Sequence, residues 1–297
     1  MFSRRHPYLF FVLVNTALVC GTLIFLSLLV TVSVSTPEFG DKVGIIEIDG
    51  VISDALPTIR DLQYFRKNDL VKAILIRINS PGGGVAPSQE IYREIQKTKS
   101  VKTVIASMGT VAASGGYYIA SAANGIVASS GTITGSIGVI MGFTNLESLF
   151  QKIGLKTSVV KSGKLKDIGS PTRPMTPEEE SFLNNFVSEI HEQFIHDVSK
   201  GRNIPIEDIR TIADGRILTG DQAKQHNLID RIGNYEDAIQ WAGRLGGIQG
   251  DISTTRPPKD PLNFIEELIQ NEIHTWISKV STFKQFQSVG YLCPYTD

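Results

Sequence analysis

The chain of 297 residues is 41% hydrophobic and has a formal net charge of −1 and a pI of about 6.5. This length and apolar content are those of a folded protein with a sizeable core, and the balanced charge, without long runs of Lys and Arg, argues against a nucleic-acid partner. The two cysteines, Cys20 and Cys293, cannot build a disulfide framework or a cysteine zinc site.

Residues 9–34 form an almost wholly apolar, uncharged segment, long enough to span the roughly 30 Å of a bilayer core. Arg4 and Arg5 precede it, so the positive-inside rule places residues 1–8 in the cytoplasm and the rest of the chain outside the inner membrane. A cleaved secretory signal is the alternative, with a cleavage site within residues 33–37. Because the run exceeds the roughly 7 to 15 apolar residues of an ordinary signal, we expect a retained single-pass transmembrane anchor.

Beyond this segment, short β-branched runs alternate with helix-like segments. Strands are predicted at residues 43–48, 73–78, 101–106, 125–128 and 157–160, helices at residues 55–67, 88–97 and 112–123, and a small-residue loop at Gly109. This alternation is typical of βαβ units with a mainly parallel sheet that is covered on both faces. The predicted fold class is α/β.

Two capped helix starts follow. Thr176, Pro177 and Glu179 read as a capping box with proline in the first turn, and residues 219–223 read as a second capped start. The first helix carries an apolar stripe at every fourth position, made of Phe182, Phe186, Ile190, Phe194 and Val198.

The C-terminal part, residues 247–297, has a different character. Prolines punctuate a linker, and the apolar positions of residues 264–280 fall on one helical face. An amphipathic tail of this kind packs on its own domain, joins subunits or lies on the membrane surface, and packing within the protein is the commonest of the three.

Residues 79–84 (NSPGGG) follow a predicted strand. Consecutive glycines permit positive φ and a close approach to backbone N–H groups, which suits an oxyanion hole or a phosphate cradle. The segment lacks the P-loop ending and the dinucleotide spacing, which disfavours phosphate binding. A plain flexible turn would look the same.

Ser114 stands among small residues in the stretch AASGG, residues 112–116. Small neighbours leave a hydroxyl unscreened at a helix start, where free N–H groups stabilise a developing negative charge, so Ser114 is a candidate nucleophile. A helix-packing motif of small residues is the alternative.

A serine nucleophile needs a base, and His and Lys are the candidate types. A Ser-His-Asp triad is unsupported, because none of the histidines is flanked like an active-site residue; they are His6, His191, His196, His226 and His274. Residues 161–168 hold three lysines, of which Lys166 lies between Leu165 and Asp167. Burial would have to bring a lysine pKa from about 10.4 toward roughly 7 to 8, and solvated surface charge is the alternative.

Several short motifs follow one another along the chain: NSPGGG at 79–84, AASGGYY at 112–118, TGSIG at 134–138 and SGKLKD at 162–167, then RILTG at 216–220, QA at 222–223 and LID at 228–230. Taken in this order, they resemble the bacterial signal peptide peptidase A family, short form. The likeness covers roughly residues 42–246, the expected peptidase domain, and an ordered set is far more specific than any single motif.

The resemblance implies a crotonase-like α/β fold related to the Clp protease proteolytic subunit, with a Ser-Lys dyad. It implies Ser114 as nucleophile, Lys166 as general base and Ser136 as the residue that orients the lysine amine. It also implies an oxyanion hole formed by the Gly83 and Gly115 N–H groups. The expected reaction is peptide hydrolysis through an acyl-enzyme, without a metal or cofactor.

The resemblance further implies a ring-like homo-oligomer and, as substrates, remnant signal peptides in the membrane. Two other classes of function stay open. The same fold hosts acyl-CoA hydratases and isomerases, which usually employ carboxylates, but no Glu stands where Ser114 lies. A membrane-tethered scaffold without catalysis would predict the loss of Ser114 or Lys166, and both are present.

Overall fold

The computed structural model describes residues 6–33, 40–258 and 290–292. It divides into two compact units, Met1–Gly40 and Asp41–Asp297. The predicted tail helix of residues 264–280 lies outside the described residues.

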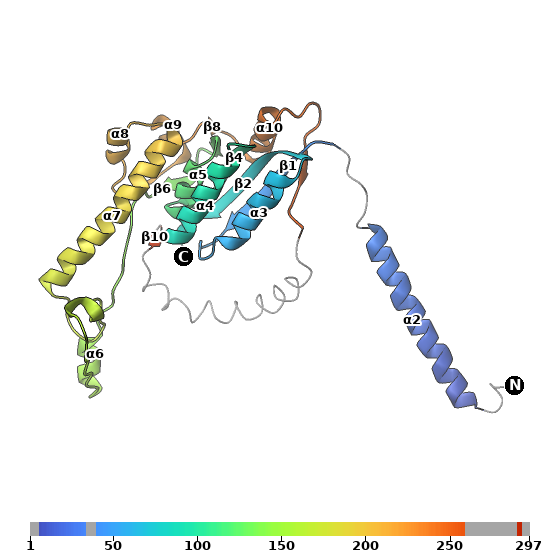
Figure 1. Ribbon diagram of the computed structural model, residues 1–297, viewed down its shortest axis with the longest axis horizontal. Coiled ribbons are helices and arrows are strands. Elements are labelled where there is room, and N and C mark those ends of the chain that lie inside the picture. Colours follow the sequence, from blue (N-terminus) through green and yellow to red (C-terminus); the bar gives the residue numbers. More distant parts are fainter. Residues whose placement is uncertain (1–5, 34–39, 259–289, 293–297) are drawn as a thin grey trace. The chain divides into compact units, whose positions relative to one another are not determined.

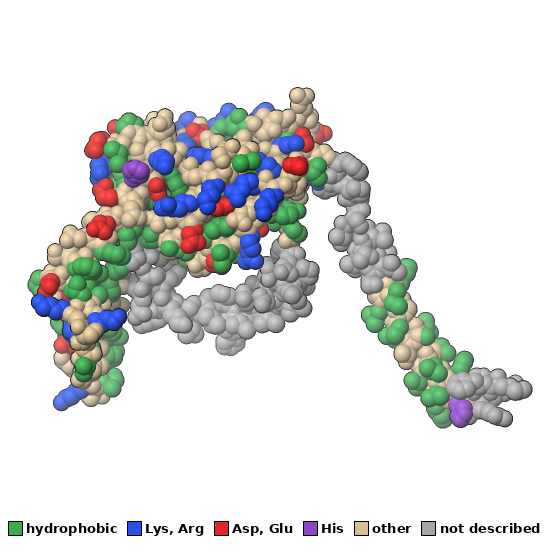
Figure 2. All heavy atoms as spheres, viewed as in Figure 1, with side chains coloured by type: hydrophobic (Ala, Val, Ile, Leu, Met, Phe, Trp, Pro, Cys, Tyr) green, Lys and Arg blue, Asp and Glu red, His purple; other side chains and the backbone are tan. Residues whose placement is uncertain are grey.

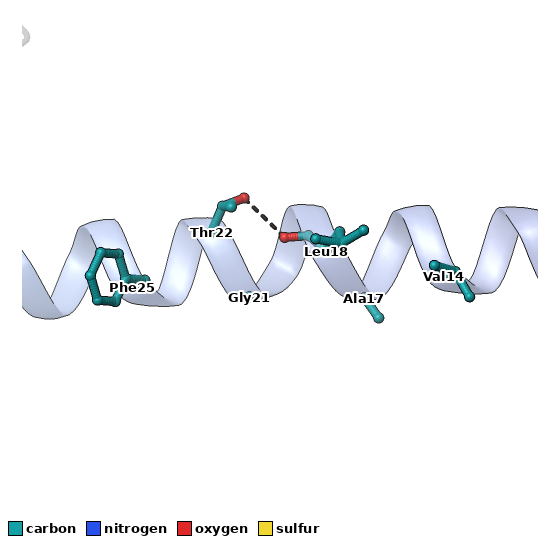
Figure 3. Close-up of a pocket in the computed structure, with 6 residues that line it drawn as sticks. All are labelled: Val14, Ala17, Leu18, Gly21, Thr22 and Phe25. Carbon is teal, nitrogen blue, oxygen red and sulfur yellow. Dashed lines mark hydrogen bonds between the residues drawn. The ribbon is translucent and has the colours of Figure 1, made fainter.

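The first unit contains one described helix, α2 (Pro7–Ser33). Its stretch Pro7–Phe25 has a mean hydropathy of 2.1, and by length and composition it could cross a membrane or serve as a signal sequence. Asn15, Thr16 and Thr22 each donate a hydrogen bond to a backbone carbonyl one turn earlier, so these polar side chains are satisfied within the helix. Figure 3 shows this bond for Thr22.

The second unit is built on a sheet of eight strands among the described residues. These are β1 (Lys42–Asp49), β2 (Val71–Ser80), β4 (Thr103–Ala113), β5 (Gly125–Ala128), β6 (Ile133–Gly135), β7 (Ile217–Leu218), β8 (Arg231–Ile232) and β9 (Ser253–Thr255). Their order is β7-β6-β4-β2-β1-β9, with β5 beside β4 and β8 beside β5. Every pairing in this sheet is parallel except that of β6 with β7. The mainly parallel sheet confirms the predicted α/β class.

Helices cover the sheet on both faces (Figure 1). Among the described residues, the α-helices of this unit are α3 (Leu56–Lys67), α4 (Val85–Thr98), α5 (Gly115–Ser121), α6 (Glu147–Lys152), α7 (Pro177–Arg202), α8 (Ile206–Arg210), α9 (Gly220–Gln225) and α10 (Tyr235–Leu245). Residues of α3, α4, α5 and α7 share one hydrophobic core, and α10 belongs to the other. In β2, Ile74 and Ile76 face the first core while Ala73 and Leu75 face the second. A β-branched run without polar alternation is what a strand buried on both faces requires.

The path of β4 differs from the prediction. The expected loop at Gly109 is part of the strand, which continues to Ala113, and the helix expected from residue 112 begins at Gly115. The reason is that β4 pairs with β2 along one side, and with β5 and then β6 along the other. A Cβ on Gly109 would lie 2.9 Å from the Asn79 Oδ1 atom, so this glycine permits a close approach rather than a turn.

The strand predicted at residues 157–160 is also wrong. These residues form no strand, and the Val160 side chain is 100% exposed. Their apolar sequence lies outside the sheet, in the segment between β6 and α7, where no neighbouring strand offers backbone partners.

The capping box of α7 is confirmed. The Thr176 hydroxyl accepts from the Glu179 N–H (3.2 Å), and the Glu179 carboxylate accepts from the Thr176 N–H (2.9 Å). The capped start predicted at residues 219–223 is confirmed as well, and there Thr219 and Gln222 form a capping box. The apolar stripe of α7 is buried only in its second half: Phe194 is 0% exposed, whereas Phe182 is 48% exposed.

The first half of α7 extends beyond the sheet together with residues 138–176, which contain α6. Figure 1 shows this projection, which we name the arm. Hydrophobic side chains lie on its surface (Figure 2). They include Ile140, Phe143, Leu149, Ile153, Leu155, Val159 and Val160, each at least 43% exposed.

Candidate active site

Three parallel strands end side by side, and the residues that follow them form the candidate site. Strand β2 ends at Ser80, β4 ends at Ala113 immediately before Ser114, and β6 ends at Gly135 immediately before Ser136. Ala113 pairs with Gly135, so the two serines are neighbours. Open α/β sheets bind their ligands at this carboxyl edge.

Ser114 has a strained backbone and a buried side chain. Its φ is 54° and its ψ is −117°, a conformation that costs a non-glycine residue about 1–3 kcal/mol. Its N–H donates to the Gly135 carbonyl (2.9 Å), and its carbonyl accepts from the Tyr118 N–H (2.8 Å). The side chain is 0% exposed, and within the described part of the chain its Oγ has no hydrogen-bond partner. A buried hydroxyl left in this state is a candidate for chemistry.

The glycines after β2 form a short strand, β3 (Gly82–Gly84), instead of the expected loop. The Ile52 N–H donates to the Gly82 carbonyl (2.9 Å), and the Gly84 N–H donates to the Ile52 carbonyl (2.8 Å). Successive residues of a strand direct their backbone groups to opposite sides, so the Gly83 N–H points away from Ile52. A Cβ on Gly83 would lie 2.1 Å from the Ile52 carbonyl oxygen, so only glycine fits.

Two buried serine hydroxyls hold this strand in place. The Ser80 Oγ accepts from the Gly82 N–H (3.1 Å), and the Ser88 Oγ donates to the Gly84 carbonyl (2.9 Å). Both serines are 0% exposed. The outer two glycines are therefore fixed, while the middle N–H is left facing the opposite side.

Gly115 packs directly against this strand. A Cβ on Gly115 would lie 2.7 Å from the Ser88 Oγ and 3.2 Å from the Gly83 N. The Gly83 amide and the Gly115 backbone are thus neighbours, and Gly115 follows Ser114 directly in the chain. Two adjacent N–H groups beside a hydroxyl are the elements of an oxyanion hole.

Ser136 is the second serine with an unusual backbone. Its φ is 50° and its side chain is 4% exposed. Its N–H donates to the carbonyl of Arg216 (2.7 Å), the first residue of the RILTG motif. This motif therefore supports the backbone of Ser136. The Nε2 of His191 in α7 lies 3.2 Å from the carbonyl of Ile137, the next residue.

Lys166 lies on the arm, in the short 3-10 helix η1 (Lys164–Asp167), and it is exposed. The following residue, Asp167, forms an ion pair with Arg173 (2.9 Å), whose guanidinium also binds Glu179 (2.5 Å). Lys166 is therefore placed near the first turn of α7.

That end of α7 is far from the strand ends. Glu179 precedes His191 by twelve residues, which is roughly 18 Å of helix axis. In Figure 1 the part of the arm that contains α6 lies beyond that end of α7, away from β6 and α5. The structure brings together Ser114, Ser136, Gly83 and Gly115, and within one chain it leaves Lys166 apart from them.

Charge pairing holds the arm together. Hydrogen bonds from Arg173 and Lys161 hold the pKa of Asp167 well below its usual range, and those from Arg173 and Thr176 lower the pKa of Glu179 to about 2. Carboxyl groups with lowered pKa values stabilise the folded arm above their unfolded pKa, about 4. This contribution is lost as the pH falls toward 2.

No group of three or more His, Cys, Asp and Glu side chains within the described ranges could hold a metal ion. The groups that the structure offers for chemistry at the strand ends are the Ser114 hydroxyl and the backbone of Gly83 and Gly115.

A parallel α/β sheet with a strained, buried serine and a glycine strand at its carboxyl edge defines a class, the serine peptidases with a Clp-like fold. The Clp protease family model matches residues 42–133. The model of Peptidase family S49 matches residues 96–249, more than half of the chain. The chain belongs to Peptidase family S49.

Relatives support this assignment. A protein of Synechocystis that is provisionally named a protease is 42% identical over 235 residues, which cover 76% of this chain and 82% of the relative. An Enterococcus faecium protein provisionally named signal peptide peptidase SppA is 33% identical, over 73% of this chain and 63% of its own length. Protease 4 of Salmonella typhi is 36% identical, over 73% of this chain and 37% of its own length.

Proposed function

We propose that this serine peptidase is a membrane-anchored endopeptidase in which Ser114 is the nucleophile and Lys166 the general base. The observation that carries the proposal is the Ser114 hydroxyl, which is buried, lacks a hydrogen-bond partner among the described residues, and lies on a strained backbone. The neighbouring Gly83 and Gly115 backbones support an oxyanion hole beside it.

The proposed reaction is acyl transfer. The Ser114 Oγ forms a bond to the peptide carbonyl carbon while its proton passes to the neutral Lys166 amine, and the Gly83 and Gly115 N–H groups donate to the resulting oxyanion. The C–N bond then breaks as the lysine returns the proton to the leaving amine. Water, activated by the same lysine, hydrolyses the acyl-enzyme. Ser136 orients the lysine amine.

A second copy of the chain supplies Lys166 in this proposal. Within one chain Lys166 is exposed on the arm and separated from the strand ends. A lysine acts as base only where burial or nearby positive charge favours its neutral form. Docking the arm on the strand ends of a neighbouring copy would bury Lys166 beside Ser114. It would also cover the exposed apolar side chains of the arm.

The proposed substrates are peptides left in the membrane, such as remnant signal peptides. The anchor is α2, whose length and composition suit a membrane span. The name of the Enterococcus faecium relative supports this substrate class. The two arginines before α2 favour a catalytic domain on the extracytoplasmic side.

We expect the full chain in lipid vesicles to cleave a vesicle-bound apolar peptide at least about tenfold faster than a soluble polar peptide of equal length, because shared anchoring raises the effective concentration. Initial rates at equal total peptide concentration measure this, and Ser114→Ala in the same vesicles gives the background. Equal rates for the two peptides, both above that background, would contradict the proposed membrane substrate but would still agree with a serine peptidase.

Replacing Ser88 by Ala is expected to lower kcat about tenfold or more with little change in KM, because the oxyanion hole acts mainly in the transition state. Loss of the Ser88 hydroxyl frees the Gly84 carbonyl and loosens the strand that carries Gly83. Peptide hydrolysis at several concentrations separates the two constants.

Ser121→Ala is the matched control. Ser121 is a buried serine in α5 whose hydroxyl donates to the Tyr118 carbonyl (2.7 Å). The Ser121→Ala variant should lose about as much thermal stability as Ser88→Ala and keep the parent kcat. An unchanged kcat in Ser88→Ala would show that Ser88 has no part in the oxyanion hole.

A further inference from the structure

Two helices begin at the backbone amides that we assign to the oxyanion hole. Helix α4 begins at Val85, directly after β3, and Gly84 is its N-cap. Helix α5 begins at Gly115, and Ser114 is its N-cap. The separation of the Gly83 and Gly115 N–H groups therefore depends on how α4 and α5 are held relative to each other.

Each of these helices presents a buried tyrosine to the same residue of α7. The Tyr118 hydroxyl of α5 donates to the Asp197 carboxylate, and the Tyr92 hydroxyl of α4 donates to the Asp197 backbone carbonyl (2.8 Å). The two tyrosine rings also meet edge to face, with their centroids 5.1 Å apart. Asp197 therefore binds both helices at once, α5 through its side chain and α4 through its backbone.

Helix α7 lies close beside α5 at this point (Figure 1). A Cβ on Gly201, one turn after Asp197, would lie 2.3 Å from the Ser121 carbonyl oxygen of α5 and 3.3 Å from the Tyr92 hydroxyl oxygen. Glycine at position 201 thus permits the close approach of the α7 backbone that brings Asp197 to both tyrosines.

Tyr118 is also joined to the candidate nucleophile through its backbone, because its N–H donates to the Ser114 carbonyl (2.8 Å). Helix α5 has only seven residues, and an isolated helix of that length is not stable in water. The strained backbone of Ser114 persists only where its surroundings hold it. A hydrogen bond from Tyr118 to a carboxylate is stronger than one between neutral groups, so it is well suited to this task.

We propose that Asp197 is a positioning residue for peptide hydrolysis, which holds α4 and α5 so that the Gly83 and Gly115 N–H groups keep the separation that the oxyanion requires. Asp197 acts through Tyr92 and Tyr118 and not on the substrate itself. The inference rests on the proposed function, because it assumes that the two amides stabilise an oxyanion. Since the oxyanion develops only in the transition state, loss of this support should lower kcat and leave KM nearly unchanged.

The test is Tyr118→Phe in the full chain, which removes the hydroxyl that binds Asp197 and keeps the buried ring. We expect kcat for a fluorogenic peptide to fall about tenfold, with KM within about twofold of the parent value, because the oxyanion donors are displaced rather than lost. Asp197→Ala should have the same effect. Asp197→Asn should keep most of the activity, because its amide oxygen still accepts from Tyr118.

Tyr117→Phe is the matched control. Tyr117 is the neighbouring buried tyrosine of α5, and its hydroxyl donates to the Leu228 carbonyl (2.9 Å). The control variant should lose about as much thermal stability as Tyr118→Phe and keep the parent kcat. A Tyr118→Phe variant that loses stability but keeps kcat would overturn the proposal.

A peptide aldehyde gives a readout that a general loss of stability would not change. The Ser114 Oγ bonds to the aldehyde carbon, its proton passes to the base, and the aldehyde oxygen becomes the oxyanion. The inhibition constant of the aldehyde should rise in Tyr118→Phe by the factor by which kcat/KM falls. Equal inhibition of Tyr118→Phe and the parent would reject the positioning role, whereas full hydrolysis by Ser114→Ala would instead reject the proposed function.

Discussion

Ser114→Ala should lower kcat/KM for peptide hydrolysis by at least about a thousandfold, the scale of losing a serine nucleophile. The free energy of unfolding should stay the same or rise. The Ser114 Oγ is buried without a hydrogen-bond partner among the described residues, so its removal breaks no hydrogen bond to them and relieves a desolvation cost of about 1–3 kcal/mol. Loss of activity with retained stability is the signature of a functional residue.

The measurement pairs fluorogenic peptide hydrolysis with denaturant unfolding. Ser107→Ala is the matched control, because Ser107 is a buried serine of β4, the strand that leads to Ser114, and its hydroxyl accepts from Arg77 (2.9 Å). It should lose stability and keep activity. Substantial hydrolysis by Ser114→Ala would show that another group is the nucleophile.

Lys166→Ala should also lower kcat/KM by at least about a thousandfold, because Ser114 would then lack its base. Lys166→Arg should not restore activity, since a guanidinium stays protonated. Because Lys166 is exposed within one chain, the substitution should leave the unfolding of an isolated copy unchanged.

Lys164→Ala is the control for this prediction. Lys164 is exposed and belongs to the same short helix as Lys166. Both variants therefore remove one positive charge from the same part of the arm. It should keep most of the activity. Full activity in Lys166→Ala would reject the dyad and direct the search to another base.

Local patterns predicted much of the fold. The β-branched runs predicted β1, β2 and β5 because strands buried on both faces need apolar side chains throughout. The capping residues predicted the start of α7, since Thr176 and Glu179 satisfy each other's backbone over only three residues. Such signals are contained within a few neighbouring residues.

Features that depend on distant pairing were missed. Strand β3 exists because Ile52, thirty residues away in sequence, binds both of its outer glycines. The short strand β6 is held by its pairing with β4 and β7, and the residues TGSIG alone do not predict a strand. Ser88 could have been noticed as a serine in the first turn of a helix that follows glycines, but its contact with Gly115 is tertiary.

The candidate site divides in the same way. Ser114, Ser136, Gly83 and Gly115 follow strands that run parallel, so their gathering at one edge follows from the topology. Sequence spacing does not predict where the long connection between β6 and α7 places Lys166. Because Lys166 lies apart from Ser114 within one chain, the proposed mechanism requires an assembly of at least two copies.

The most direct test of this account mixes two inactive copies. Ser114→Ala supplies Lys166, Lys166→Ala supplies Ser114, and the two are co-expressed or mixed and reassembled in equal amounts. We expect about a quarter of the wild-type activity, because half of the sites hold Ser114 and half of their neighbours offer Lys166 across a head-to-tail interface. A mixture with no activity above either parent, while both copies assemble together, would contradict a site shared between chains.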